Sequence, residues 1–146
     1  MNTRHAYFAA TALACALFVF HTFVLFETAL ALGYLIHPAI QHLGVHLGGP
    51  ALIFFTFLLL FCVHLLEAFV WALFFYRLRQ FHSLGESLYF CGTSLTALGY
   101  GDVTLKRPWQ NLGPIMATNG ILMFGCSTAF LFLVIQKIWM ALEVVS

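Results

Sequence analysis

The stretch TALGYGD at 96–102 is the most informative part of the sequence, because it follows an apolar segment too short to cross a membrane. Ser83 and Glu86 have the S-x-x-E spacing of a capping box, which predicts that a helix begins just after Ser83. We expect this helix over 84–96, with a length of roughly 18 Å, about half of a bilayer. A half-length helix that enters and leaves on the same side is tolerated only inside protein or along a water-filled path. The pattern therefore indicates a pore or a substrate site.

The composition excludes an ordinary soluble domain. Hydrophobic residues make up 62% of the 146 residues and charged residues only 8%, whereas a typical globular chain has about 25% charged residues. There is no polar tract and no basic run, which excludes disordered and nucleic-acid-binding proteins. The four cysteines have no CxxC spacing, so we expect residues of membrane helices rather than zinc ligands or disulfides.

Three apolar runs reach the roughly 20 residues that a spanning helix needs. They cover about 5–36, 51–76 and 108–136. The first run is too long for the apolar core of a signal peptide, so we expect an uncleaved first span. Residues 37–50 are rich in His, Gly and Pro, which predicts a loop between the first two spans.

These features resemble potassium channels of the prokaryotic two-helix pore-loop type, whose selectivity filter is T-V-G-Y-G followed by Asp. The resemblance implies an all-α membrane protein with three transmembrane helices, a re-entrant pore helix and a filter loop, assembled as a homotetramer. The implied pore domain covers 51–146, with an outer helix over 51–78, a pore helix over 84–96, a filter over 97–102 and an inner helix over 110–144. Residues 1–50 would add an extra N-terminal transmembrane helix and loop.

The resemblance also implies roles for residues of the loop. Such filters replace the water shell of K⁺ by backbone carbonyls, and the implied carbonyls are those of Ala97, Leu98, Gly99, Tyr100 and Gly101. Glycine would let left-handed backbone angles alternate with ordinary ones. The residues implied to support the filter are Tyr89, Phe90, Ser94, Thr96 and Asp102.

Two filter residues depart from the family. Ala97 stands where the family has a threonine, whose hydroxyl supplies ligands at the innermost ion site, and Leu98 replaces a valine. Alanine has a carbonyl but no hydroxyl. We therefore expect a weaker innermost site in this chain.

The inner helix contains residues of a candidate cavity. Gly120 falls about where the family has a hinge glycine, and Gly125 follows it, but either can equally serve close helix packing. The residues implied to face the cavity are Ile121, Phe124 and Thr128. Asn119 is a rare intramembrane amide, which we expect to bond to a neighbouring helix or to cavity water. On the outer helix, His64 and Glu67 are three residues apart and can meet on one face.

The function expected from this pattern is a passive potassium channel. It would work as a homotetramer in the lipid bilayer, with permeant K⁺ ions at the filter carbonyls, no other cofactor and no nucleic acid. The alternatives are a weakly selective cation channel, because Ala97 lacks the hydroxyl, and a non-conducting membrane subunit. A haem protein, with haem held by His21 and His64, is a further alternative, but it leaves the G-Y-G-D motif unexplained. No nucleophile–base pair stands out, so no enzyme is expected, and the small size favours a multi-pass protein of a prokaryotic inner (plasma) membrane.

The charges and the resemblance disagree about membrane orientation. The family's filter opens to the outside, which would place most basic residues outside, namely Arg4, Arg77, Arg79, Lys106 and Arg107. The positive-inside rule prefers the opposite. We expect the outward filter, because the cavity and the inner-helix gate normally serve the cytoplasmic side.

Overall fold

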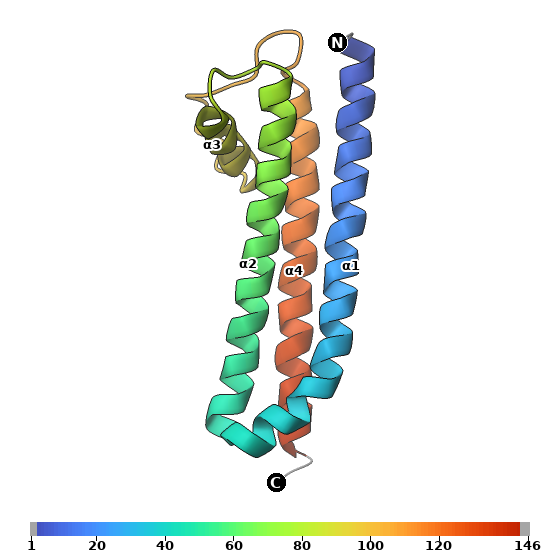
Figure 1. Ribbon diagram of the computed structural model, residues 1–146, viewed down its shortest axis with the longest axis vertical. Helices are drawn as coiled ribbons and strands as arrows, with labels where there is room; N and C mark the ends of the chain where they lie inside the picture. The colour runs from blue at the N-terminus through green and yellow to red at the C-terminus, as the bar shows by residue number, and fades with distance from the viewer. Residues whose placement is uncertain (1–2, 144–146) are drawn as a thin grey trace. The chain divides into compact units, whose positions relative to one another are not determined.

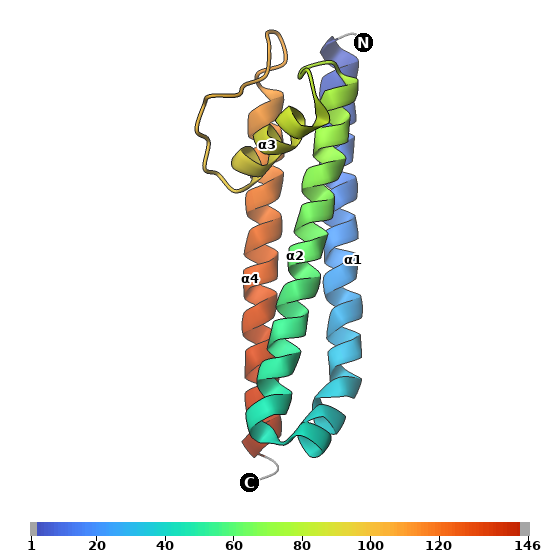
Figure 2. The same ribbon diagram turned by 60° about the vertical axis from the view of Figure 1, so that its left-hand side comes forward.

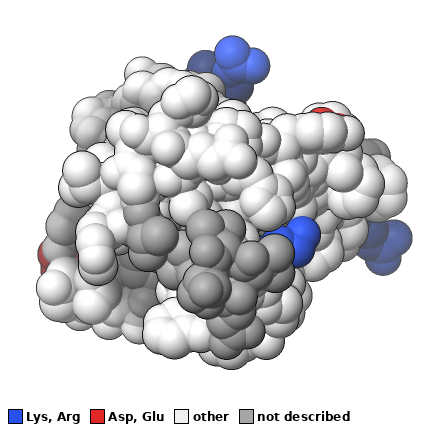
Figure 3. Space-filling view, turned by 90° about the horizontal axis from the view of Figure 1, so that it is seen from below, with Lys and Arg blue, Asp and Glu red and all other residues white. Residues whose placement is uncertain are grey.

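The computed structural model describes residues 3–143, and every regular element in that range is a helix (Figure 1). The elements are α1 (Thr3–Leu43), α2 (Val45–Arg77), α3 (Leu84–Leu95) and α4 (Leu112–Glu143). By length and composition, α1, α2 and α4 can each cross a membrane, which confirms the prediction of three candidate spans. Figure 3, which is seen from below along the long axis, shows that most of the visible described surface is uncharged, with a few basic and acidic side chains, most of them near its edges.

The connection between α1 and α2 differs from the loop predicted over 37–50. Pro38 lies inside α1, and Gly44, with φ +73°, is the single residue between the two helices. Tertiary packing explains the difference: Ile40 is buried in an apolar core, and a Cβ at Gly48 would lie 2.6 Å from the carbonyl oxygen of Ala39. Gly48 thus allows the ends of the two helices to approach closely, and Gly44 supplies the left-handed residue that joins them. α2 therefore starts earlier than the outer helix predicted over 51–78.

The inner helix matches its prediction within two residues at its start, since α4 begins at Leu112 rather than at 110. The predicted last residue, 144, lies outside the described residues. Residues 107–111, just before α4, form turns in which the amide of Leu112 donates to the carbonyl of Trp109 at 2.9 Å.

The chain divides into two compact units, one made of residues 1–20 and 64–124 and the other of 21–63 and 125–146. We call them the first and the second unit. The first unit contains α3 and the whole TALGYGD stretch. It is therefore the unit that positions the candidate site.

α3 is held in the first unit by a hydrogen bond and by aromatic packing. The Ser87 hydroxyl donates to the carbonyl oxygen of Ala72 on α2 at 2.7 Å. The rings of Phe75 and Phe90 pack edge to face with centroids 5.6 Å apart. Figures 1 and 2 show α3 beside α2 and α4 within this unit. The buried apolar core includes Ala6, Ala10, Leu17, Trp71, Phe75, Phe90, Leu95, Leu112, Met116 and Met123.

The second unit has its own apolar core on α1, α2 and α4. A buried polar contact joins α1 to α4, because Nε2 of His21 and the hydroxyl of Ser127 are 3.0 Å apart. The core residues are Leu32, Ile36, Ile40, Leu60, Phe130, Val134, Ile138 and Ala141. A satisfied polar pair inside an apolar helix bundle fixes which faces of the helices meet.

α2 ends in a Schellman motif. The amide of Gln80 donates to the carbonyl of Phe75 at 3.2 Å, and the amide of Arg79 donates to the carbonyl of Tyr76 at 2.9 Å. This motif needs one left-handed residue, which is usually glycine. Here that residue is Arg79, with φ +56°, and its Cβ costs about 1–2 kcal/mol relative to a right-handed conformation. Arginine is therefore an unfavourable residue for the turn itself.

Candidate functional site: the loop after α3

α3 begins at a cap made by the two residues that the sequence pairs. The backbone amide of Glu86 donates to the Ser83 hydroxyl at 3.1 Å, and the amide of His82 donates to the Glu86 carboxylate at 2.9 Å. Ser83 has extended backbone angles, as an N-cap residue requires. The capping box therefore acts as predicted, except that the returning contact uses His82 rather than Ser83.

The loop after α3 has an alternating backbone. Ala97, Gly99 and Gly101 have φ values of +59°, +55° and +78°, while Leu98 and Tyr100 between them do not have positive φ. The left-handed angles at the two glycines follow the prediction. The left-handed angle at Ala97 has no signal in the sequence, because alanine avoids this region at a cost of about 1 kcal/mol.

Two hydrogen bonds fold the loop back onto the last turn of α3. The amide of Ala97 donates to the carbonyl of Ser94 at 3.1 Å, and the amide of Gly99 donates to the carbonyl of Thr93 at 3.0 Å. These bonds satisfy carbonyls that a helix end otherwise leaves without partners. The start of the loop is thus tied to the helix that precedes it.

The far end of the loop is held by a tyrosine–carboxylate pair. The Tyr89 hydroxyl donates to Oδ2 of Asp102 at 2.8 Å, and Oδ1 of Asp102 accepts from the amide of Val103 at 3.1 Å. The hydrogen bond to the Asp102 carboxylate raises the pKa of Tyr89 above its usual value. Tyr89 therefore stays a neutral donor at physiological pH, and it bridges α3 to the loop.

The side chains of the loop are left largely uncovered by the described part of the chain. Leu98 is 59% exposed and Tyr100 is 66% exposed. Two large side chains of the loop are therefore available for contact with a further surface.

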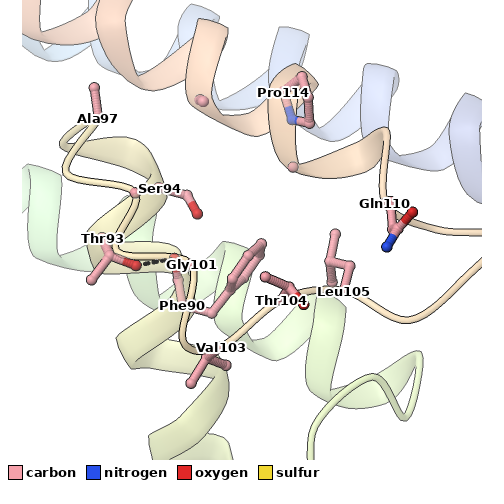
Figure 4. A pocket seen from close by; sticks show the side chains of 13 residues that line it. Phe90, Thr93, Ser94, Ala97, Gly101, Val103, Thr104, Leu105, Gln110 and Pro114 are labelled. Atoms are coloured by element: carbon pink, nitrogen blue, oxygen red, sulfur yellow. Dashed lines mark hydrogen bonds between the residues drawn. The ribbon is translucent and has the colours of Figure 1, made fainter.

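A cavity of about 430 Å³ lies between α3, the loop and the first turns of α4. Figure 4 shows Phe90 and Ser94 on one side of this space and Gln110 and Pro114 on the other. The hydroxyl of Thr93 donates to the carbonyl of Phe90 at 3.1 Å. The hydroxyl of Thr96, a predicted support residue, donates to the carbonyl of Gly92 at 2.7 Å. Both threonines therefore stabilise the last turns of α3 through their hydroxyls.

On α4, the structure favours packing for Gly120. A Cβ at this residue would lie 2.7 Å from the carbonyl oxygen of Leu95, at the end of α3. A Cβ at Gly125 would meet no atom within 4 Å. Of the predicted cavity residues, Ile121 and Thr128 are exposed, and the ring of Phe124 stacks on the His64 ring with centroids 4.1 Å apart.

Buried polar side chains link the helices of the first unit. Nε1 of Trp71 donates to Oδ1 of Asn119 at 3.3 Å, and Nδ2 of Asn119 donates to the carbonyl of Ala14 at 3.2 Å. This confirms that Asn119 bonds to neighbouring helices, and it joins α1, α2 and α4. Nδ1 of His64 and Oε2 of Glu67 are 3.1 Å apart, which confirms the predicted i, i+3 contact.

No curated protein and no solved structure matches the chain. A family model described as "Ion channel" matches residues 62–137, which is more than half of the chain. The match begins within α2 and ends within α4, so it contains α3 and the loop, whereas α1 lies outside it. The chain therefore belongs to this family of pore-loop ion channels.

Proposed function

We propose that four copies of this chain form a passive channel in which the carbonyls of 97–101 bind dehydrated K⁺ ions. The observation that carries the proposal is the alternation of left-handed and ordinary residues directly after a half-length helix. Alternate handedness turns successive peptide planes so that their carbonyls share one side. A single row of carbonyls cannot replace a water shell, so rings of carbonyls from symmetry-related copies are required.

The exposure of the loop supports a closed ring of copies. Tyr100 and Leu98 belong to a loop whose backbone is held by α3, and more than half of the surface of each residue is exposed within the described part of one chain. A neighbouring copy would bury these side chains and keep the ring of carbonyls at a fixed diameter. α3 would then be the re-entrant pore helix, and its C-terminal end, which carries partial negative charge, would favour a cation.

Ala97 supports a second candidate, a weakly selective cation channel. Its carbonyl remains available, but it offers no hydroxyl to the innermost ion site. Fewer oxygen ligands at that site lower the advantage of K⁺ over a hydrated Na⁺ ion. The family match supports a transport protein, and we propose a prokaryotic inner membrane as its location.

Reversal potentials decide between these candidates. The full chain, reconstituted in planar bilayers with K⁺ on one side and Na⁺ on the other, is expected to show a large reversal potential of the sign set by K⁺ permeation. With Rb⁺ in place of Na⁺ the reversal potential is expected to be smaller, because Rb⁺ is close to K⁺ in size. A reversal potential near zero under K⁺/Na⁺ conditions would establish the weakly selective channel. Absence of current and of ion flux into proteoliposomes, with intact tetramers, would establish a non-conducting subunit.

We further propose that the filter opens to the outside of the cell. Single cysteines at Lys106 and Gln41, both of which are exposed, can be tested with a membrane-impermeant thiol reagent on intact cells, after the native cysteines are replaced. Labelling at 106 but not at 41 is expected. The reverse pattern would show that the basic residues near the loop lie inside, as the positive-inside rule prefers.

A further inference from the structure

A basic pocket lies in the first unit, away from the TALGYGD loop. It has a volume of about 500 Å³ and is lined by Tyr76, Arg77, Arg79, Phe81, His82 and Lys106. These residues come from the end of α2, from the turn before α3 and from the segment before α4. Every charged residue of the lining is basic, and two aromatic side chains complete the wall.

The left-handed backbone conformation of Arg79 indicates that its side chain has a functional role. Arg79 fills the left-handed position of the Schellman motif, with φ +56°. Glycine would form the same turn without the strain of a Cβ. Backbone strain in a folded protein tends to occur at functional sites, where a side chain is required in that place. The side chain held there lines the basic pocket.

The positive charges of the pocket lack acidic partners within residues 3–143. In that range, the structure shows no salt bridge to Arg77, Arg79 or Lys106. The acidic side chains closest in sequence are Glu86 and Asp102, and both have other partners. Glu86 accepts a hydrogen bond from the amide of His82. Asp102 accepts from the Tyr89 hydroxyl and from the amide of Val103. Like charges gathered in a concave site repel each other, and an anion in the site removes this repulsion.

We propose that this pocket binds the phosphate group of an anionic phospholipid. Arginine side chains bind phosphate oxygens through paired hydrogen bonds, and lysine adds a point charge. The pocket lies where the apolar run of α2 ends in Arg77, which is where the headgroups of a bilayer begin. Tyr76, which is 43% exposed, is a residue type enriched at this level of the membrane. Basic pockets at the ends of membrane helices bind anionic headgroups in this way.

The Arg79→Gly variant tests lipid binding separately from the stability of the fold. Without lipid, the variant is expected to unfold at the same temperature as the wild-type chain or at a higher one, because the turn loses its strain. In detergent titrations with phosphatidylglycerol, its affinity is expected to fall about fivefold, the contribution of one basic residue near an anionic surface. Lys106→Gln, which leaves the α2 turn intact, is expected to weaken binding by a similar factor. Native mass spectrometry of the purified protein measures the bound lipid.

Arg107→Gln is the matched control, because Arg107 is exposed and adjacent in sequence to Lys106 but does not line the pocket. The control is expected to bind phosphatidylglycerol as the wild type does. An equal loss in the control would show diffuse attraction rather than a site and would overturn the proposal. Equal binding of phosphatidylcholine by the wild type would overturn it too. Competition by inorganic phosphate at lower concentration than the lipid would identify free phosphate as the ligand and overturn the lipid assignment.

Discussion

Gly120 of α4 and Leu95 of α3 are in direct backbone contact. A Cβ at residue 120 would lie 2.7 Å from the carbonyl oxygen of Leu95 and 3.0 Å from its Cα. Leu95 is the last residue of α3, and the alternating loop begins two residues later. The close approach at Gly120 therefore sets the level on α4 at which α3 ends and the candidate filter begins.

Gly120→Ala is expected to separate α3 from α4 and to lower the thermal stability of the purified protein. The new methyl group meets backbone, which cannot move as a side chain can. Gly125→Ala is the matched control for stability, because a Cβ there meets no atom within 4 Å and alanine is the better helix former by about 1 kcal/mol. Thermal unfolding in detergent measures both. A greater loss of stability in Gly125→Ala than in Gly120→Ala would contradict the packing role.

Gly99→Ala is expected to abolish conduction while the proposed tetramer persists. Gly99 has φ +55°, and a Cβ there meets no atom within 4 Å, so the cost is conformational, about 1 kcal/mol or more per subunit. The loop can escape this cost only by leaving the alternating conformation. Proteoliposome flux and native mass spectrometry measure the two outcomes. Wild-type flux in this variant would remove the filter hypothesis.

Two substitutions of Ala97 test two different properties, the backbone strain at this residue and its contribution to an ion site. Ala97→Gly removes a Cβ from a residue with φ +59° and is expected to raise thermal stability by a fraction of the strain, about 0.5–1 kcal/mol per subunit. Ala97→Thr adds a hydroxyl and is expected to increase discrimination of K⁺ over Na⁺ or to tighten block by Ba²⁺. Permeability ratios and Ba²⁺ titrations in planar bilayers measure the second effect. If neither changes in the threonine variant, residue 97 does not contribute to an ion site.

The Tyr89–Asp102 pair is expected to make the stability of the folded protein fall at alkaline pH. The hydrogen bond raises the pKa of Tyr89 in the folded protein, so this stabilisation is complete below the unfolded value of about 10. It is lost as the pH rises through the folded value. The phenolate absorbance of the folded protein is expected to show one late-titrating tyrosine, absent in Tyr89→Phe. In Asp102→Asn, the same tyrosine is expected to titrate at a lower pH. An unchanged titration of this tyrosine would show that the Asp102 carboxylate does not raise its pKa.

Asn119→Leu tests whether α1 is a structural part of the channel. The substitution leaves Nε1 of Trp71 without its acceptor and removes the bond to the carbonyl of Ala14. Loss of a buried partner is expected to cost about 1–3 kcal/mol, measured as a lower unfolding temperature. Thr118→Ala, at the exposed neighbouring position, is the control. Equal stability of Asn119→Leu and the control would show that the three-helix link is dispensable.

Features that depend on neighbours along the chain can be predicted from the amino-acid sequence. Charge spacing and apolar length place the three candidate spans, and the cap at Ser83 and Glu86 places the start of α3, because a capping box is a local interaction. The glycines at 99 and 101 predict left-handed angles, since only glycine adopts them at no cost.

Features that depend on residues far apart in the chain follow only from the packing of the helices. The helical course of 37–50 follows from the burial of Ile40 and the close approach at Gly48, although the local signals favour a loop. The left-handed angle at Ala97 and the packing of Gly120 on Leu95 arise because α3, the loop and α4 meet in space. The basic pocket likewise joins Arg79 to Lys106, a proximity that no periodicity or spacing in the sequence encodes, because contact across a fold depends on how whole helices pack.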